Sequence, residues 1–530
     1  MIPWESDDHT AAATADSAEK YILSLDVGGT STRAILFDRK GEVRGRVSEL
    51  TSTQAPEEGA MEHEPEDVWQ AALKVIGKTF AELPGGGKEI SALGISVQRA
   101  TFCLWEREGG QIRTPFISWS DVRAADTARR MNRMRLWKIL QFLARIGSFV
   151  TGSTFLTAAS QLVFVTDHAL PRLVWLFERE PDLRKDAKEG KILFGTIETY
   201  LVYRLTRGRV HATDASNAAA TSLYNPFSLK WNRIFCRFFK IPMNMLPLVK
   251  NTADDFGRTE GSLFGGVEVP IRAVAGDQMA ALFGHCCFHA GEVKISQGSG
   301  SFVDVNVGSK GRGSRRGLFP LVAWCMGGAP TYMLEGSVAT AGRLIDWLGN
   351  GLGLSDTPAI LNEFAENCED TAGVVFVPTP AGIRFPYFNP KAKGAILGLS
   401  LSVHRSHVAR AVLEGIAHRI VDILEGIRKD TGMPIVRIKV DGGVSRSDVL
   451  LQAIADFSGY TVERSREVDM TALGAAFFAG MGCGVWKSLE ELCSMDRNYE
   501  VFTPAKDAHY RKRKMEEWHK AVDTVLRLHH

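Results

Sequence analysis

Three glycine-rich turns in this sequence have the composition of phosphate-binding segments. The first combines Asp26, two glycines, Thr30, Ser31, Thr32 and Arg33. Glycines let the backbone approach an anion closely, and consecutive backbone N–H groups can cradle phosphate, with hydroxyls and a guanidinium as further donors. Asp26 follows an apolar run, where its carboxylate could hold water on Mg²⁺, a cation that keeps several waters. Taken alone, this turn is equally consistent with an ordinary hairpin connection.

The other two turns lie in the second half of the chain. Gly298-Ser299-Gly300 separates two apolar runs, and Asp441 to Ser447 precedes a helical pattern that continues to Phe457. A turn that leads into a helix N-terminus suits the anionic or ribose end of a nucleotide. Two glycine hairpins and such a turn resemble the signature of the actin-like ATPase fold, and this resemblance implies ATP as a ligand.

A carboxylate with two alternative roles follows the apolar run that ends at Gly276. Asp277 precedes an apolar helical pattern, where it could cap the helix. A carboxylate at the edge between two domains could instead orient and deprotonate an attacking hydroxyl, since phosphoryl transfer depends mainly on positioning and charge neutralisation. The residues alone leave both roles open.

The elements expected around these residues alternate between strands and helices. Strands are predicted at 21–26, 34–37 and 93–96, with a helix between them at 68–80. A second strand–turn–strand unit, 293–297 and 302–305, repeats the first. The pattern predicts an α/β protein made of two similar halves, with a boundary near 284–291. The segment 311–317 is rich in Gly and Arg, and is expected to be an exposed loop.

The composition excludes several classes of partner. The 530 residues include 63 Lys and Arg against 61 Asp and Glu, which gives no reason to expect a nucleic-acid partner. The eight cysteines lack zinc or disulfide spacing, and no run of 18 apolar residues predicts a membrane-spanning helix. The polar segment 1–20 is expected to be disordered rather than a signal peptide. We therefore expect a cytoplasmic protein, and the sequence leaves a homo-oligomer open.

A basic amphipathic helix is predicted at 129–146. Its apolar side chains share one helical face, among a series of Arg and Lys residues. Two interpretations are open: binding to a membrane surface or a partner, or packing of the apolar face on the protein body with a solvated basic face. We favour the second, because such apolar stripes are mostly core faces.

The chain resembles the FGGY carbohydrate kinases of the glycerol kinase type over nearly its whole length, from about Tyr21 to Trp486. The matching stretches are Gly94–Arg99, Trp119–Arg123, Phe194–Thr199, Thr213–Ala218, Ala275–Gly284, Leu334–Val338, Arg384–Gly398 and Thr471–Ala476. Residues 94–102 and 116–124 are most similar to the animal branch called glycerol kinase 5. The resemblance implies a two-domain ribonuclease H-like (actin-like ATPase) fold with the active site in the interdomain cleft. It also implies a polyol-binding domain at 21–284, a nucleotide-binding domain at 291–486 and a C-terminal helical extension at 487–530.

The same resemblance implies site residues. Asp277 matches the general base, and Asp26 and Asp277 match the carboxylates near Mg²⁺. The polyol-binding residues are expected to be Gln98, Arg99, Gln278, Trp119 and Phe302. The ATP-binding residues are expected to be Thr30, Ser31, Thr32, Arg33, Ser299, Gly342, Gly443 and Ser447.

Two positions depart from the family pattern in the substrate half. Ala100 stands where the family usually has a glutamate that accepts hydrogen bonds from substrate hydroxyls, and Asp167 stands at the position of a substrate-binding tyrosine. The resemblance implies ATP-dependent phosphorylation of glycerol or a related small polyol. The alternatives are a kinase of another small sugar or polyol, and a catalytically weak ATP-binding regulator.

Overall fold

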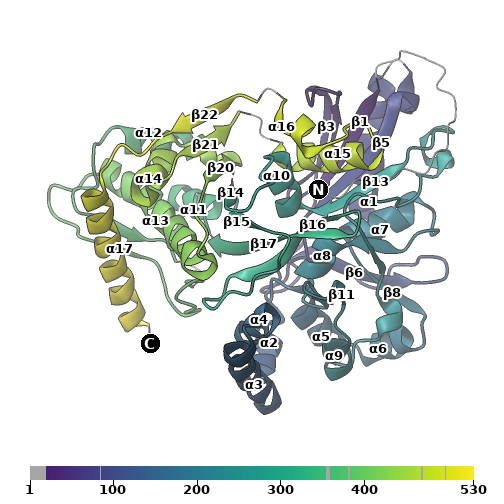
Figure 1. The fold of residues 1–530 in the computed structure, drawn as a ribbon, viewed down its shortest axis with the longest axis horizontal. Coiled ribbons are helices and arrows are strands. Elements are labelled where there is room, and N and C mark those ends of the chain that lie inside the picture. The colour runs from purple at the N-terminus through teal and green to yellow at the C-terminus, as the bar shows by residue number, and fades with distance from the viewer. Residues whose placement is uncertain are drawn as a thin grey trace.

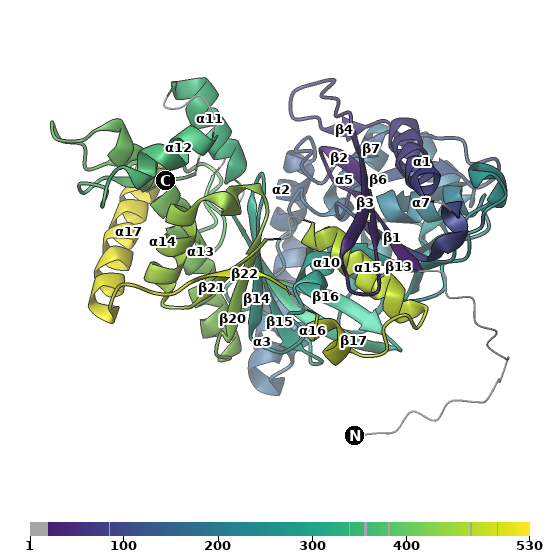
Figure 2. The same cartoon turned by 90° about the horizontal axis from the view of Figure 1, so that it is seen from above.

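The chain folds into two lobes that lie side by side, as Figures 1 and 2 show. The computed structural model describes residues 20–83, 85–338, 340–353, 358–379, 382–466, 469–495 and 497–529. The predicted disordered tail, 1–20, lies outside the described residues except for Lys20. Within the described residues, no helix combines the length and apolar composition needed to cross a membrane.

The first lobe is built on a five-stranded sheet with the order β13-β5-β1-β2-β3. Its strands are β1 (Tyr21–Val27), β2 (Ser31–Phe37), β3 (Val43–Leu50), β5 (Ile90–Val97) and β13 (Ile271–Gly276). β1 is antiparallel to β2 and parallel to β5, and β5 is parallel to β13. β1 is buried on both faces, which explains why it reads as a continuous apolar run.

The second lobe repeats this arrangement. Its sheet has the order β16-β17-β15-β14-β20-β21-β22. The strands are β14 (Glu292–Gln297), β15 (Ser301–Gly308), β16 (Phe319–Met326), β17 (Ala329–Val338), β20 (Arg437–Asp441), β21 (Val462–Ser465) and β22 (Tyr499–Phe502). β14 is antiparallel to β15 and parallel to β20, and β20 is parallel to β21, as in the first sheet. The predicted pair of similar halves, each opening with a glycine hairpin, is therefore confirmed.

Helices cover both sheets. In the first lobe they include α1 (Pro65–Glu82), α6 (Pro181–Lys188), α7 (Ile197–Leu205), α8 (Ala215–Ala220), α9 (Arg233–Phe238) and α10 (Asp277–Gly284). In the second half of the sequence they are α11 (Gly342–Leu352), α12 (Pro358–Glu366), α13 (Arg405–Thr431), α14 (Asp448–Ser458), α15 (Met470–Gly482), α16 (Leu489–Cys493) and α17 (Ala508–Leu528). Short strand pairs are β9 (Ala212–Asp214) with β12 (Leu248–Lys250), β10 (Tyr224–Asn225) with β11 (Lys230–Trp231), and β18 (Val375–Val377) with β19 (Ala395–Leu397).

Helix α15 belongs to the second half of the sequence but packs on the first lobe. It follows β21 of the second sheet, yet it lies against the strands of the first sheet and beside α10 (Figures 1 and 2). Glycines allow this close approach: a Cβ on Gly94 would lie 2.2 Å from the Ala475 carbonyl oxygen, and a Cβ on Gly474 would lie 1.8 Å from that of Ala280. The predicted domain ranges 21–284 and 291–486 therefore divide the sequence, while α15 joins the two lobes in space.

An insertion with its own sheet and helices extends the first lobe. Its strands are β4 (Glu62–His63), β6 (Phe102–Glu106), β7 (Phe116–Ile117) and β8 (Ile192–Thr196), and its helices are α2 (Ala125–Arg133), α3 (Arg135–Thr151), α4 (Thr154–Gln161) and α5 (Ala169–Arg179). The predicted basic helix is divided between α2 and α3, and in α3 only Trp137, Ala144 and Ser148 are buried. The expectation that its apolar face packs on the body is wrong, because most of that face is exposed.

Two further expectations need correction. The C-terminal extension is not purely helical, because β22 pairs with β21 at the edge of the second sheet between α16 and α17. The loop 311–317 is exposed only at Arg315 and Arg316. Ser314 is buried, and its hydroxyl accepts the backbone N–H of Leu318 at 2.9 Å.

Candidate active site

A small cavity between the two lobes contains the charged residues with the clearest chemistry. Its volume is about 80 Å³. From the first half of the chain it is lined by Arg99, Ala100, Trp119, Asp167, His168, Ala220 and Asp277, and from the second half by Phe302, Phe319, Leu321, Glu335 and Ser337. Residues of both lobes therefore form one site.

Arg99 joins a carboxylate of each lobe. Its Nε donates to Asp277 Oδ1 at 3.1 Å, and its Nη2 donates to Glu335 Oε2 at 2.7 Å. Burial raises the pKa of Glu335 to about 7, although the Arg99 charge opposes this shift. The three side chains form a charged cluster that joins the two lobes.

Asp277 is placed by the junction of β13 and α10. It is the first residue of α10, after the N-cap Gly276, so it is not the capping residue. Its Oδ1 also accepts the backbone N–H of Gln278 at 2.8 Å, and the positive end of the helix dipole favours its charge. Its Oδ2 makes no hydrogen bond within the described part of the chain, and the side chain is 29% exposed. One carboxylate oxygen is thus available to an incoming hydroxyl.

Two aromatic rings, one from each lobe, form a wall of the cavity. The ring centres of Trp119 and Phe302 are 6.1 Å apart with an interplanar angle of 72°. The Arg99 guanidinium lies 6.0 Å from the centre of the Phe302 ring. Such rings suit the carbon skeleton of a small polyol, beside the charged cluster that suits its hydroxyls.

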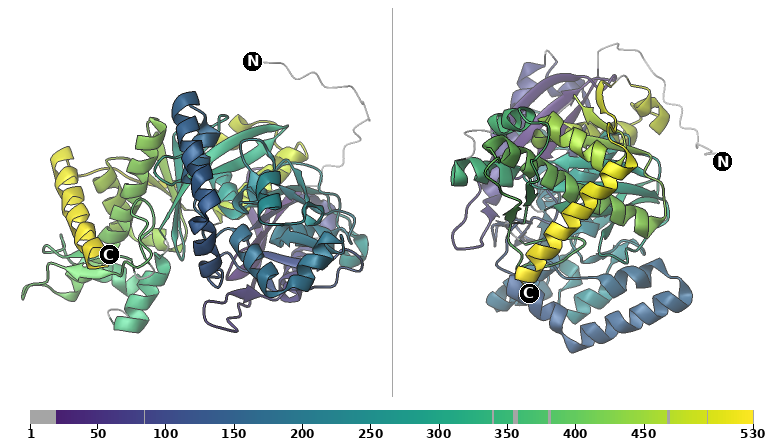
Figure 3. Two further views of the ribbon diagram at one scale, coloured as in Figure 1. Left: turned by 90° about the horizontal axis from the view of Figure 1, so that it is seen from below. Right: turned by 90° about the vertical axis from the view of Figure 1, so that its left-hand side faces the viewer.

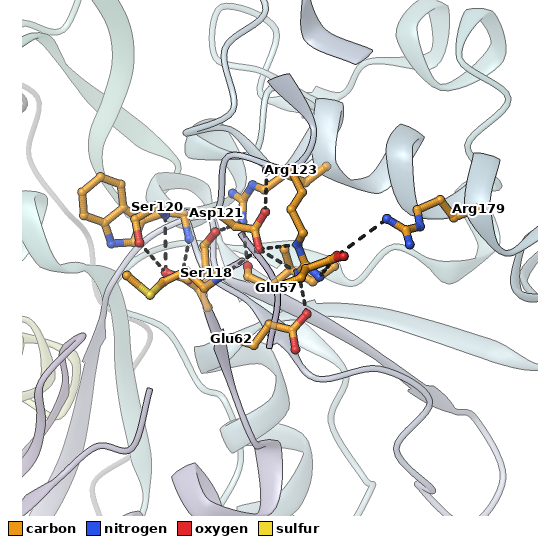
Figure 4. A network of polar contacts seen from close by, with 12 residues as sticks. Glu57, Glu62, Ser118, Ser120, Asp121, Arg123 and Arg179 are labelled. Carbon is orange, nitrogen blue, oxygen red and sulfur yellow. Dashed lines mark hydrogen bonds and ion pairs between the residues drawn. The ribbon is translucent and has the colours of Figure 1, made fainter. Parts of the chain in front are cut away.

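The loop that carries Trp119 is held by the network drawn in Figure 4. Arg123 pairs with Asp121 at 2.7 Å, with Glu57 at 3.1 Å and with Glu62. These carboxylates raise the pKa of Arg123 even though partial burial opposes the shift. The backbone N–H of Met61 donates to Asp121 Oδ2 at 2.9 Å, so the loop is tied to the segment that precedes β4.

A fully buried arginine of α5 supports the same cavity wall. Arg172 donates to the carbonyl oxygens of Ile117 and Ser118, both at 2.6 Å, and to that of Ala100 at 2.7 Å. It also donates to the carbonyl oxygen of Asp167 at 3.1 Å. Arg172 thus positions three cavity-lining segments of the first lobe without contacting the cavity itself.

A second ion pair joins the lobes at the side of the cavity. Arg384 Nη1 lies 2.6 Å from Asp167 Oδ2 and donates to Ser337 Oγ at 3.2 Å. Asp167 is therefore engaged by the second lobe, and its carboxylate forms part of the cavity wall.

Two predicted polyol-binding residues lie outside this cavity. Gln98 Nε2 is 3.1 Å from His63 Nε2, and Gln278 Oε1 accepts from Lys294 Nζ at 2.5 Å. Both side chains are buried, and neither lines the cavity. The structure instead places Arg99, Trp119, Phe302 and Asp277 together.

The first glycine turn presents a paired carboxylate. Asp26 accepts from Arg33 Nη2 at 2.5 Å and from Ser96 Oγ at 2.8 Å, and burial raises its pKa despite the Arg33 charge. Thr30 is exposed and Ser31 is half-buried. Thr32 is fully buried and lies 3.3 Å, Oγ1 to Oγ1, from Thr51, so its hydroxyl points into the protein.

The second-half turns meet around Gly342. The backbone N–H of Gly342 donates to the Gly298 carbonyl oxygen at 3.0 Å, and a Cβ on Gly342 would lie 2.8 Å from that oxygen. Ser299 is exposed, and Gly443 begins the short 3-10 helix η4 (Gly443–Arg446). Ser447 caps α14 and donates to Asn362 Oδ1 at 2.5 Å, so its hydroxyl is already engaged.

The carboxylates near the cleft could support a hydrated cation. Burial, and to a smaller extent the charge of Asp277, raises the pKa of Asp26. Among the described residues, no group of three or more His, Cys, Asp or Glu side chains could hold a metal ion directly. This donor set fits Mg²⁺ held largely by water and phosphate oxygens.

Sequence comparisons identify the family. Residues 21–284 match the N-terminal domain of the FGGY family of carbohydrate kinases, and residues 293–483 match its C-terminal domain. The chain belongs to this family.

Individual relatives of this FGGY kinase cover nearly its whole length. It is 39% identical over 486 residues to "Glycerol kinase 5" of Danio rerio, covering 92% of each chain. It is 35% identical over 510 residues to the glycerol kinase of Francisella philomiragia, covering 96% of this chain and 99% of the relative. The solved structure of Plasmodium falciparum glycerol kinase with ADP aligns with a TM-score of 0.86 at 28% identity, covering 96% of this chain and 98% of that one. The expected two-domain fold is confirmed.

The sequence patterns assign no role to two charged residues of the candidate site. Glu335 lies in a stretch that matches the family, and Arg172 lies outside all of these stretches. Each had a visible signal, because each is a charged residue inside a segment that is otherwise largely apolar.

Proposed function

We propose that this FGGY kinase transfers the γ-phosphoryl group of ATP to glycerol, giving glycerol 3-phosphate and ADP. The observation that supports this most is the Arg99, Asp277 and Glu335 cluster inside a cavity of about 80 Å³. A small cavity with a few convergent charged groups and two aromatic walls suits a small polar acceptor. Glycerol is such an acceptor.

Asp277 is the proposed general base. Its carboxylate takes the proton of the acceptor hydroxyl as that oxygen bonds to the γ-phosphorus, while the bond from the γ-phosphorus to the β,γ-bridging oxygen breaks and ADP leaves. Arg99 and Glu335 orient the other hydroxyls, and Trp119 with Phe302 packs on the carbons. Closure of the two lobes around the cavity would exclude water from the reaction.

The proposed nucleotide site lies along the glycine turns of both lobes. Thr30, Ser31 and Arg33 face it from the first lobe, and Ser299, Gly342 and Gly443 from the second. Asp26 and Asp277 would hold the water shell of Mg²⁺, which neutralises phosphate charge when bound. Thr32 and Ser447 would contact the nucleotide only through their backbone atoms. The Thr32 hydroxyl is buried beside Thr51, and the Ser447 hydroxyl donates to Asn362.

The acceptor experiment uses ADP release with ATP and Mg²⁺, and a panel of glycerol, dihydroxyacetone, tetritols and pentoses. We expect ADP release that depends on glycerol. Release that is equally fast without any acceptor would contradict the proposal, and release that requires a tetritol or pentose would replace glycerol with that acceptor.

The Ala100→Glu variant tests the pocket separately. A hydrogen bond to a charged group contributes about 1.5–3 kcal/mol, so an added carboxylate should raise kcat/KM for glycerol roughly 10- to 100-fold. The matched variant Glu335→Gln should lower kcat/KM for glycerol by a similar factor, because the glutamine side chain carries no charge. Unchanged kcat/KM in both variants would show that neither position contacts the acceptor.

A further inference from the structure

Helix α3 carries a broad apolar face that the rest of the molecule does not cover. Its exposed apolar side chains range from 40% exposed for Leu140 to 87% for Phe149. They are Leu136, Ile139, Leu140, Phe142, Leu143, Ile146, Phe149 and Val150. Contiguous exposed apolar patches on this scale mark interaction sites, whereas singly scattered apolar residues do not.

The opposite side of α3 is firmly attached to the protein. Trp137 is buried, with its ring centre 4.8 Å from that of Phe164 and 5.7 Å from that of Phe235. Gln141 Nε2 donates to the Leu162 carbonyl oxygen at 2.9 Å. The helix therefore has a docked face, and the apolar face opposite it points outward.

The placement of α3 leaves that face accessible. Figure 1 shows α2, α3 and α4 at the lower edge of the molecule, and the left panel of Figure 3 shows the dark blue helix lying across the outside. A flat surface could approach this edge and meet α3 before the sheets of either lobe.

The charge around α3 is entirely positive along the chain. Residues 127–166 contain no Asp or Glu, and they contain six basic residues, namely Arg129, Arg130, Arg133, Arg135, Lys138 and Arg145. Arg129 pairs with Asp126 and Arg130 with Glu178. The other four form no ion pair with any described residue. At 100° per residue, Lys138 and Arg145 lie between the docked face and the apolar face.

We propose that α3 docks this kinase in the plane of an anionic membrane surface. An amphipathic helix with Phe, Leu and Ile on one face and Lys or Arg beside it lies in the interface, with its apolar face below the headgroups. Lys138 and Arg145 would then lie at headgroup level, where they attract anionic lipid. The proposal depends only on α3 and its surroundings, and is independent of the acceptor.

The charges favour a membrane over a second copy of this chain. Pairing of two α3 faces about a twofold axis would bring the basic flanks of both helices near each other, with no acidic residue of 127–166 to compensate. An anionic bilayer supplies both the apolar layer and the opposite charge.

Vesicle flotation of the full-length protein tests the apolar contact. We expect the protein to float with phosphatidylcholine vesicles containing phosphatidylserine, and Phe142→Ser/Phe149→Ser to reduce bound protein at least tenfold. The control Leu50→Ser/Leu401→Ser alters two side chains that are 88% and 106% exposed elsewhere, and should float normally. Acceptor-dependent ADP release and thermal stability should be unchanged in both, because all four positions are exposed.

Charge reversal tests the electrostatic contribution. Each basic residue near an anionic surface contributes about a fivefold factor, so Lys138→Glu/Arg145→Glu, which removes two positive charges and adds two negative ones, should weaken binding by at least about 30-fold. The control Lys520→Glu/Arg527→Glu has the same seven-residue spacing on α17, and neither residue forms an ion pair with a described residue. No flotation of the unmodified protein, or equal flotation of every variant, would overturn the proposal. A dimer that Phe142→Ser/Phe149→Ser dissociates, in the absence of vesicle binding, would overturn it in favour of self-association.

Discussion

The hairpins that open the two halves share one backbone but carry different chemistry at matching positions. In the first, Asp26 of β1 lies opposite Arg33 of β2 and beside Ser96 of β5. In the second, Ser296 of β14 lies opposite Phe302 of β15 and beside Asp441 of β20. The carboxylate and the hydroxyl have exchanged strands, and the position of the arginine is taken by an aromatic ring of the acceptor cavity.

The pKa values of these two carboxylates, Asp26 and Asp441, are shifted in opposite directions. Burial raises the pKa of Asp26 although Arg33 is nearby. Burial also opposes ionisation of Asp441, but its hydrogen bonds with His285, at 3.0 Å, and with Ser296 lower its pKa. A duplicated scaffold can therefore supply one carboxylate for the proposed nucleotide site and another for structural support.

The largest expected difference between the two halves concerns the residues that follow β13 in the first sheet and β21 in the second. β13 is followed at once by Asp277, which begins α10 and lines the cavity, whereas the described carboxylate after β21, Asp469, is the N-cap residue of α15 and pairs with Arg33 and Arg46. Asp277→Asn should lower kcat by ~10² or more and leave ATP affinity unchanged. Steady-state kinetics and nucleotide titration measure both. Near-normal turnover would remove Asp277 from the mechanism.

A smaller difference is expected between the exchanged carboxylates. Asp26→Asn should raise the Mg²⁺ concentration for half-maximal activity about tenfold, as loss of a group that orients metal-bound water commonly does. Asp441→Asn should leave that concentration unchanged and lower the free energy of unfolding by about 1.5 kcal/mol, since a charged hydrogen bond with His285 is lost. Equal Mg²⁺ dependence of the two variants would mean that the halves do not differ in this way.

The smallest effect concerns a buried glutamate in each half. Burial raises the pKa of both Glu198 and Glu335 to about 7, but Glu335 has Arg99 beside it, whereas the side-chain partners of Glu198 among the described residues are the hydroxyls of Thr196, Thr199 and Thr213. Below about pH 4.5 both folded and unfolded protein hold the Glu198 proton, and between about 4.5 and 7 only the folded protein does. Stability contributed by this group therefore falls as pH rises through that window.

The glutamine of Glu198→Gln cannot ionise, so this variant should not show that fall in stability with rising pH. Between pH 5 and pH 8, the free energy of unfolding of this variant should rise by about 2.5 kcal/mol relative to that of the unmodified protein. Denaturant unfolding at both pH values measures the change. The exposed control Glu516→Gln should follow the unmodified protein, and parallel pH profiles for all three proteins would contradict the assignment.

The sequence predicted features that depend on local chemistry. The glycine hairpins, the turn before α14 and the position of Asp277 follow from short segments, because glycine turns and strand ends are encoded locally. Gln98 and Gln278 were expected at the acceptor, but His63 and Lys294, distant in sequence, hold their side chains elsewhere. The exposed face of α3 could not be predicted either, because an apolar stripe has the same pattern whether or not another element covers it.

The position of α15 has a consequence for synthesis on the ribosome. Its residues, up to Gly482, emerge nearly two hundred residues after the first sheet ends at Gly276, yet they form part of that sheet's core. The first lobe therefore cannot complete its packing when its own strands have been synthesised. Part of its apolar surface stays exposed to solvent until α15 has been synthesised and can cover it. Folding of the two halves is coupled in time, and a chain terminated between them would expose a surface prone to aggregation.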